Sequence, residues 1–216
     1  MLFYPPGALW FVLACIVGSQ LLKPFIKRGK LMLAIIIGIV LYMFALLANN
    51  YYFLLLGSPF QNIIDLYLHL FISARNGFFV GFIFLAIGIF CSKINISPRN
   101  SVVLAVFFGL CLFIETIFLK GKVFADEGSL FLSHLLLVPT LFLALKNINF
   151  CIKYELSLLL RNLSTGMYYL HKPILFVVCL FAEHQLLIFS MTLIISLLIC
   201  LLAYRTKFLC LDKILR

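Results

Sequence analysis

Long apolar runs alternate with short polar segments along the whole chain. A hydrocarbon core about 30 Å thick requires about 20 apolar residues in each crossing helix. Seven runs approach that length: Tyr4–Leu22, Leu31–Leu47, Gly77–Cys91, Val102–Leu119, Ser129–Leu145, Thr165–Ala182 and Gln185–Ala203. The pattern predicts an all-α fold, a polytopic integral membrane helical bundle with about seven transmembrane helices.

Two further segments have apolar residues at helical spacing on one face only. The first carries Phe60, Ile63, Ile64, Tyr67 and Phe71, and the second carries Ile152, Leu156, Leu159, Leu160 and Leu163. A helix that is apolar on one face lies flat at a membrane surface, so we expect two interfacial helices. Neither an internal repeat nor a long linker interrupts the chain, which predicts one membrane-embedded domain over residues 1–216.

The composition agrees with a membrane location. Hydrophobic residues make up 65% of the 216 residues and charged residues 11%, and the mean hydropathy is +1.19. Soluble domains are roughly half apolar and about a quarter charged, so a soluble fold would lack the polar surface to cover this chain. The seven cysteines form no CxxC pair and are interpreted as packing residues. No secretory signal peptide is visible, so we expect the first helix in the mature chain.

The distribution of basic residues predicts an orientation. Thirteen of the seventeen lie in alternate loops, namely Lys23, Lys27, Arg28, Lys30, Lys93, Arg99, Lys146, Lys153, Arg161, Arg205, Lys207, Lys213 and Arg216. The opposite loops contain only Arg75, Lys120 and Lys122, and Lys172 lies within the sixth run. Because basic loops stay in the cytoplasm, the N-terminus is predicted outside and the C-terminus inside. The same distribution explains the net charge of +10 without a nucleic-acid partner.

Four ionisable residues inside the runs are candidates for chemistry: Glu115, His134, His171 and Lys172. Such groups cost roughly 2.5–3.5 kcal/mol each at the centre of a membrane helix, so they tend to face a bundle interior or a wet cavity. Arg75 begins the third run and is a candidate partner for Glu115. The pair is either a structural ion pair or part of a substrate-contacting site.

The predicted outer segments add further polar side chains. Asp126 and Glu127 lie in one outer loop, and Asp65 and His69 are four residues apart on the outer interfacial helix. Singly, each is typical of a solvated loop or helix surface. Together they suit a hydroxyl-rich or anionic substrate that enters from outside.

His171 is the strongest candidate for acid–base work, because an imidazole exchanges protons near neutral pH. The alternative is a helix-packing histidine bonded to a neighbouring carbonyl. Lys172 either extends to the interface or pairs with Glu115.

The basic segment KPFIKRGK at 23–30 offers Lys23, Lys27 and Arg28, which either hold phosphates of a cytoplasmic donor or only orient the chain. No ligand spacing within one run predicts a metal site, and we expect no tightly bound cofactor.

Four phrases occur in a recognisable order: GALWFVLACIVGSQLL at 7–22, ARNGFFVGFIFLAIGIF at 74–90, LFIETIFLKGKVFADEGSLFLSHLLLVPTLFLAL at 112–145 and LSTGMYYLHKPIL at 163–175. In this order they resemble the membrane acyltransferase-3 family, bacterial enzymes that acylate sugars of surface polysaccharides. The resemblance implies a ten-helix enzyme of the bacterial cytoplasmic membrane. Such an enzyme transfers an acyl group, usually acetyl, from the co-substrate acyl-coenzyme A to a hydroxyl of a glycan or glycolipid.

The resemblance also implies site residues. It makes His171 and Glu115 the catalytic candidates. It also makes Trp10, Arg75 and Asn76 candidates for acceptor binding. The polar residues predicted on the outer side add His134 and Asp126 to these, and the basic segment at 23–30 supplies Lys23, Lys27 and Arg28 as candidates for the donor phosphates.

The chain departs from the family at its beginning. Family members begin with further helices, the first of which carries an Arg and a His regarded as catalytic, and nothing here precedes the ALWF helix. The chain therefore resembles the C-terminal two-thirds of such an enzyme without the first three helices, and an N-terminal helical segment is an expected partner. The leading hypothesis is an acyltransferase. The second is an inactive relative that acts as a membrane partner or as a component of a glycan-lipid transporter.

Overall fold

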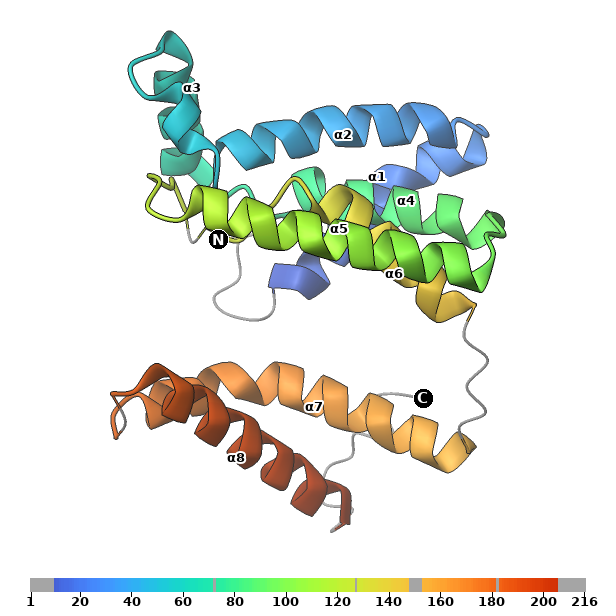
Figure 1. Ribbon diagram of the computed structural model, residues 1–216, viewed down its shortest axis with the longest axis vertical. Helices are drawn as coiled ribbons and strands as arrows, with labels where there is room; N and C mark the ends of the chain where they lie inside the picture. The colour runs from blue at the N-terminus through green and yellow to red at the C-terminus, as the bar shows by residue number, and fades with distance from the viewer. Residues whose placement is uncertain (1–9, 72, 127, 148–152, 182, 206–216) are drawn as a thin grey trace. The chain divides into compact units, whose positions relative to one another are not determined.

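The structure is a computed structural model that describes residues 10–71, 73–126, 128–147, 153–181 and 183–205 (Figure 1). Within these ranges the chain forms eight α-helices and no strand, which confirms the predicted all-α class. Contacts between Cα atoms divide the chain into two compact units, Met1–Asn149 and Phe150–Arg216. They are called the first and the second unit below.

The described part of the first unit contains six α-helices: α1 (Trp10–Lys27), α2 (Leu31–Leu47), α3 (Pro59–Phe71), α4 (Phe82–Lys93), α5 (Pro98–Leu119) and α6 (His134–Lys146). A 3₁₀ turn at Tyr52–Leu55 follows α2, and a π-helical turn at Gly77–Gly81 leads directly into α4. Helices α1, α2 and α6 pack against α4, and α5 packs against α6. Figure 1 shows α3 across one end of these five helices.

Small residues let α1 approach the π-helical turn. A Cβ atom added at Gly81 would lie 2.3 Å from the carbonyl oxygen of Ala14, and one added at Gly18 would lie 2.7 Å from the carbonyl carbon of Gly81. Close backbone approach over small residues is a typical packing mode of membrane helices, where the lipid supplies no hydrophobic drive for association.

The second unit is a hairpin of α7 (Tyr154–Val178) and α8 (Gln185–Arg205), which pack against each other. Ile174 and Val178 of α7 are buried against Ile188 and Ile195 of α8. Gly166 allows further close packing, since an added Cβ would lie 2.7 Å from Cys200 Sγ.

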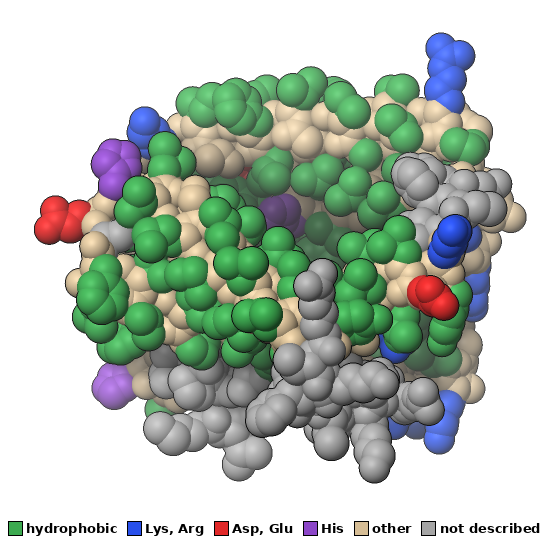
Figure 2. Space-filling view, turned by 90° about the horizontal axis from the view of Figure 1, so that it is seen from below, with side chains coloured by type: hydrophobic (Ala, Val, Ile, Leu, Met, Phe, Trp, Pro, Cys, Tyr) green, Lys and Arg blue, Asp and Glu red, His purple; other side chains and the backbone are tan. Residues whose placement is uncertain are grey.

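Among the described residues, three helical stretches are long and apolar enough to cross a membrane: Trp10–Lys27, Pro98–Leu119 and Gln185–Tyr204. Shorter apolar helices occupy Leu31–Leu47, Gly77–Lys93 and His134–Lys146. Hydrophobic side chains are spread over the described part of the face seen in Figure 2, and the Lys, Arg, Asp and Glu side chains there lie mostly towards its edges. These features indicate a multi-pass membrane protein.

The helices follow most of the predicted runs. Helix α2 has the predicted bounds Leu31–Leu47. Helix α5 begins at Pro98, earlier than predicted, because Ser97 caps it by accepting a hydrogen bond from the Asn100 amide at 3.3 Å. Helix α6 begins at His134 instead of Ser129, because side chains of other segments bind the preceding backbone amides.

The two predicted interfacial helices have different outcomes. The first corresponds to α3, where Ile64 is buried while Phe60 and Ile63 are 64% and 56% exposed. The second is not a separate element, because α7 continues from Tyr154 through the sixth run to Val178. No proline interrupts the junction, and one glycine costs only about 1 kcal/mol within a helix.

Parts of several predictions lie outside the described residues. These are 4–9 of the first run, Ile152, Ala182, Glu127, Lys207, Lys213 and Arg216.

Candidate functional site

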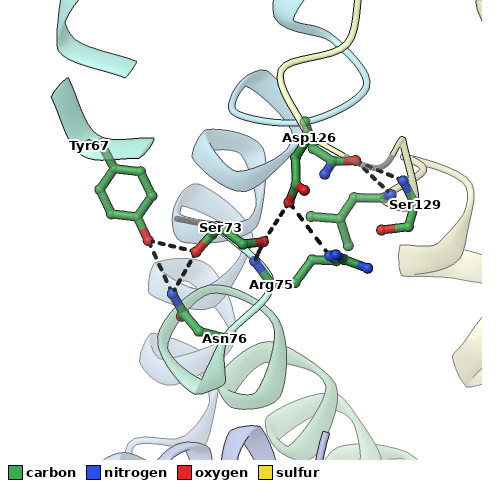
Figure 3. A network of polar contacts seen from close by, with 8 residues as sticks. Tyr67, Ser73, Arg75, Asn76, Asp126 and Ser129 are labelled. Carbon is green, nitrogen blue, oxygen red and sulfur yellow. Dashed lines mark hydrogen bonds and ion pairs between the residues drawn. The ribbon is translucent and has the colours of Figure 1, made fainter. Parts of the chain in front are cut away.

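Three segments meet at one end of the first unit, and we call this region the polar end. They are residues 49–52 after α2, residues 73–76 before the π-helical turn, and residues 125–126 with 128–133 between α5 and α6. The Ala125 amide donates to the Asn49 carbonyl at 3.2 Å. Figure 3 shows Ser73 and Arg75 turned towards Asp126 at this junction.

Arg75 is the buried cation of the polar end. Arg75 is 7% exposed, and its Nε lies 3.6 Å from Asp126 Oδ2. The Ser73 hydroxyl donates to the same carboxylate oxygen at 2.5 Å, and the guanidinium carbon lies 5.8 Å from the centre of the Trp10 ring. Arg75 is thus held by a carboxylate and an aromatic face.

Asn76 caps the π-helical turn. Its Oδ1 accepts from the amides of Phe78 and Phe79 at 3.0 and 3.2 Å, and its Nδ2 donates to the Tyr67 hydroxyl at 3.1 Å. The Tyr67 hydroxyl donates in turn to the Ser73 carbonyl at 3.3 Å. Burial raises the pKa of the Tyr67 phenol, which keeps it protonated. The Asn76 side chain therefore joins α3 to the start of α4.

Glu115 closes the N-terminus of α6 from a different helix. Its carboxylate accepts from the amides of Leu132 and Ser133 at 2.6 and 2.8 Å and from the Ser133 hydroxyl. Tyr51 donates a fourth hydrogen bond at 2.6 Å. A carboxylate beside a helix N-terminus satisfies free amides and interacts favourably with the helix dipole.

The structure therefore assigns different partners from those predicted. The hypothesis that Arg75 pairs with Glu115 is replaced by an Arg75–Asp126 ion pair and a separate Glu115 cap. Glu115 accepts four hydrogen bonds, about as many as a carboxylate offers sites for. Its contacts explain a structural role, and its catalytic role stays a prediction.

Two fully buried asparagines follow α2. Asn49 Oδ1 accepts from the amides of Ser129 and Leu130 at 2.9 and 3.0 Å, which fixes the segment before α6. Within the described part of the chain, neither side-chain polar atom of Asn50 has a hydrogen-bond partner. Asn49 Nδ2 also has no such partner there, so the two residues differ in their side-chain oxygens, of which only that of Asn49 accepts hydrogen bonds.

His134 and His171 lie in different units. His134 is the first residue of α6, directly after Ser133, and its ring centre is 5.3 Å from that of Phe131. His171 lies in α7 with Nδ1 at 2.7 Å from the Tyr168 carbonyl and 3.3 Å from the Met167 carbonyl. Contact with a neighbouring carbonyl is what we expected of a histidine that only packs between helices. The contact involves only one of the two ring nitrogens.

The predicted donor-binding residues lie at the other end of α1. Lys23, Lys27 and Arg28 are exposed, and Lys23 Nζ donates to Gln20 Oε1 at 2.8 Å. Since a helix rises about 1.5 Å per residue, α1 holds Trp10 and Lys27 about 25 Å apart. Acceptor-binding and donor-binding candidates are thus separated along this helix.

A cavity of about 320 Å³ lies beside the polar end. Helix α1 contributes Trp10, Leu13, Ala14 and Val17, α3 contributes Tyr67 and Phe71, and the chain from Asn76 to Phe79 completes the lining. Most of the lining is hydrocarbon. Trp10 and Asn76, predicted to bind an acceptor, both border it.

The predicted acceptor residues come together in part. Trp10, Arg75 and Asp126 form connected contacts, and Asn76 joins them through Ser73, to whose carbonyl its Nδ2 donates at 3.4 Å. The sequence analysis missed Tyr51, Ser73, Ser133 and Asn49, uncharged residues whose only signal is their polarity beside apolar runs. No group of three or more potential metal ligands occurs among the described residues.

The fold and the polar end define the class of protein as a helical membrane protein with a hydrogen-bonded polar cluster beside an apolar cavity. Comparison with models of known families, with curated proteins and with solved structures finds no match.

Proposed function

We propose that this chain forms the acceptor-binding part of a membrane acyltransferase. The enzyme would transfer an acyl group, such as acetyl, from acyl-coenzyme A to a sugar hydroxyl of a surface polysaccharide or glycolipid. We place it in a bacterial cytoplasmic membrane, with the polar end outside and the basic loops inside.

One observation carries the proposal. Three of the four phrases that resemble the acyltransferase family contribute residues to one cluster: Trp10 from the first, Arg75 from the second and Asp126 from the third. These residues are far apart in sequence, so composition alone does not explain their contacts. A buried arginine, hydroxyls and amides beside an indole ring are groups that recognise a sugar or its anionic carrier.

The separation of the exposed basic residues from the polar end supports the entry of donor and acceptor from opposite sides of the membrane. The polar end contains Arg75 paired with Asp126, whereas α1 ends in exposed Lys27 followed by exposed Arg28. Phosphates of coenzyme A suit exposed Lys and Arg side chains. An enzyme that takes its donor from the cytoplasm and its acceptor from outside requires donor-binding residues at one end and acceptor-binding residues at the other.

The reaction joins the sugar hydroxyl oxygen to the thioester carbonyl carbon and breaks the carbon–sulfur bond. The hydroxyl proton passes to a base, and the coenzyme A thiolate leaves and takes up a proton. His171 is the proposed base, because its Nδ1 lies 2.7 Å from the Tyr168 carbonyl and can donate to it. That contact leaves Nε2 as the proton acceptor.

The test deletes the gene from the cells of its source organism and then reintroduces it in wild-type or variant form. The content of ester-linked acyl groups on the surface glycan is measured in each strain. We expect the wild-type gene to restore the esters and His171→Ala to lower them at least 100-fold, as for loss of a general base. His184→Ala is the matched control, because His184 is exposed in the same unit. Unchanged ester content after deletion would refute the acyltransferase, and full activity of His171→Ala would remove that residue from the mechanism.

A second function, an inactive membrane partner, is favoured by the contacts of Glu115. All four of its hydrogen bonds serve to hold the loop before α6 and the segment after α2. Under this alternative, deletion would leave the transfer of radiolabel from acetyl-coenzyme A in isolated membranes unchanged.

A further inference from the structure

We propose that the cavity beside α1 holds the hydrocarbon chain of a membrane lipid. This lipid is also the carrier to which the acceptor sugar is attached. That part of the inference rests on the proposed acyltransferase function. The acceptor would then be lipid-linked when it is acylated.

The α1 side of the cavity is a single stripe. Trp10, Leu13, Ala14 and Val17 follow the spacing i, i+3, i+4, i+7, which places them on one face of the helix. At about 1.5 Å per residue this stripe is about 10 Å long. It gives the cavity a wall that runs along a candidate membrane-spanning helix.

The side-chain polar atoms of Asn76 and Tyr67, which line the cavity, are already hydrogen-bonded. Asn76 accepts from two backbone amides and donates to Tyr67, and Tyr67 donates to the Ser73 carbonyl. A cavity holds ordered water only when it offers two to four free polar partners. The pairing of Asn76 and Tyr67 therefore favours an apolar occupant over water or a sugar.

The cavity also has an outlet and a rigid wall. Phe71 and Phe78 line it and are 41% and 48% exposed, so the cavity reaches the surface of the first unit. Gly77 packs tightly on α1, since an added Cβ would lie 2.6 Å from Val17 Cβ. The volume of about 320 Å³ is at the lower end of the 300–1,000 Å³ that is usual for ligand pockets.

The position of Trp10 orients the occupant. Trp10 borders the cavity, and Arg75 lies 5.8 Å from its ring centre. Tryptophan and tyrosine are enriched where membrane helices meet water. A lipid whose chain follows α1 therefore has its polar head at the polar end, where the proposed acceptor residues lie.

The test uses a phospholipid with a photoreactive diazirine near the end of one acyl chain, incorporated into vesicles with the full chain. We expect crosslinks on peptides that contain Leu13 or Phe79. Leu13→Trp fills the cavity with an indole and should lower the crosslink yield at least fivefold. Ile16→Trp is the matched control, since Ile16 is 53% exposed on α1 and does not line the cavity; its yield should equal that of the wild type.

A melting temperature for each variant separates loss of binding from loss of fold. Equal crosslinking in both tryptophan variants, or crosslinks spread evenly over exposed residues, would overturn the lipid site. With the acyltransferase active, Leu13→Trp should raise the KM for a lipid-linked acceptor and leave a short-chain acceptor unaffected. Crosslinking at the cavity without any acyl transfer would refute the proposed function and retain the lipid site.

Discussion

Glu115 illustrates how an acid in an apolar helix is stabilised by uncharged hydrogen-bond donors. Four donors surround its carboxylate, two of them backbone amides at the start of α6. Burial and the hydrogen bond to Glu115 raise the pKa of Tyr51, so its phenol stays protonated and continues to donate at neutral pH. The cost of placing a carboxylate here is offset by donors that would otherwise be unpaired.

Glu115→Gln should destabilise the first unit more than Tyr51→Phe does. Glutamine places an NH₂ group against the amide donors of α6, whereas phenylalanine removes one donor from a carboxylate that keeps three. We expect losses of about 2–3 kcal/mol and about 1 kcal/mol respectively. Denaturant titration in mixed micelles measures both, and a larger loss in Tyr51→Phe would contradict the capping role.

The adjacent asparagines should respond in opposite directions to leucine. Asn49→Leu leaves the amides of Ser129 and Leu130 without their acceptor and should lower the free energy of unfolding by at least about 2 kcal/mol. Asn50→Leu removes an amide without a described partner and should change it by less than about 1 kcal/mol, or increase it. The same titration compares the variants. Equal losses would mean that the Asn50 amide has a partner in the folded protein.

At the scale of elements, the contact between α1 and the π-helical turn positions the site. The turn presents Asn76 and Phe78 to the cavity while its glycines pack on α1. Short π-helical segments occur frequently at functional sites. Here the turn packs on α1 directly after Arg75 and Asn76, and the Arg75 guanidinium carbon lies 5.8 Å from the centre of the Trp10 ring.

Gly81→Ala and Gly88→Ala form a matched test of that contact. The new Cβ at Gly81 would lie 2.3 Å from the Ala14 carbonyl oxygen, whereas at Gly88 nothing lies within 4 Å. We expect Gly81→Ala to cost about 1–3 kcal/mol by overpacking, and Gly88→Ala to gain up to about 1 kcal/mol from helix propensity. Thermal unfolding in detergent measures both, and tolerance of Gly81→Ala would contradict the close approach.

At the scale of the whole molecule, the charge distribution predicts the orientation. Lys146 Nζ donates to the carbonyls of Ser92 and Ile94 at 2.8 and 3.1 Å, which ties the end of α6 to the connection between α4 and α5. Figure 1 shows these segments at the same end of the first unit as the connection between α1 and α2. Basic residues therefore gather at one end of the unit, as the positive-inside rule requires.

Cysteine labelling tests this orientation. With a membrane-impermeant maleimide on intact cells, Lys122→Cys should be labelled at once and Lys27→Cys only after permeabilisation, each relative to the unsubstituted chain. Both positions are exposed. The reverse order would invert the predicted topology and place the basic end outside.

Prediction succeeded where local pattern decides structure. The bounds of α2 and the position of α5 follow from uninterrupted apolar runs, and the amphipathic spacing at 59–71 indicated α3. The separate helix predicted before the sixth run was wrong, because a change from one-sided to all-round apolarity does not break a helix that has no proline at the junction.

The sequence by itself determined the all-α class, most helix positions and the separation of basic from polar ends, because these depend on residues within one or two helical turns. Only the tertiary structure decided that Asp126 pairs with Arg75 and that Glu115 caps α6. Those choices depend on the path of the segment between α5 and α6, which has no periodicity. Its backbone amides are bound by Asn49 and Glu115, side chains that precede Ser129 and Ser133 by 80 and 18 residues.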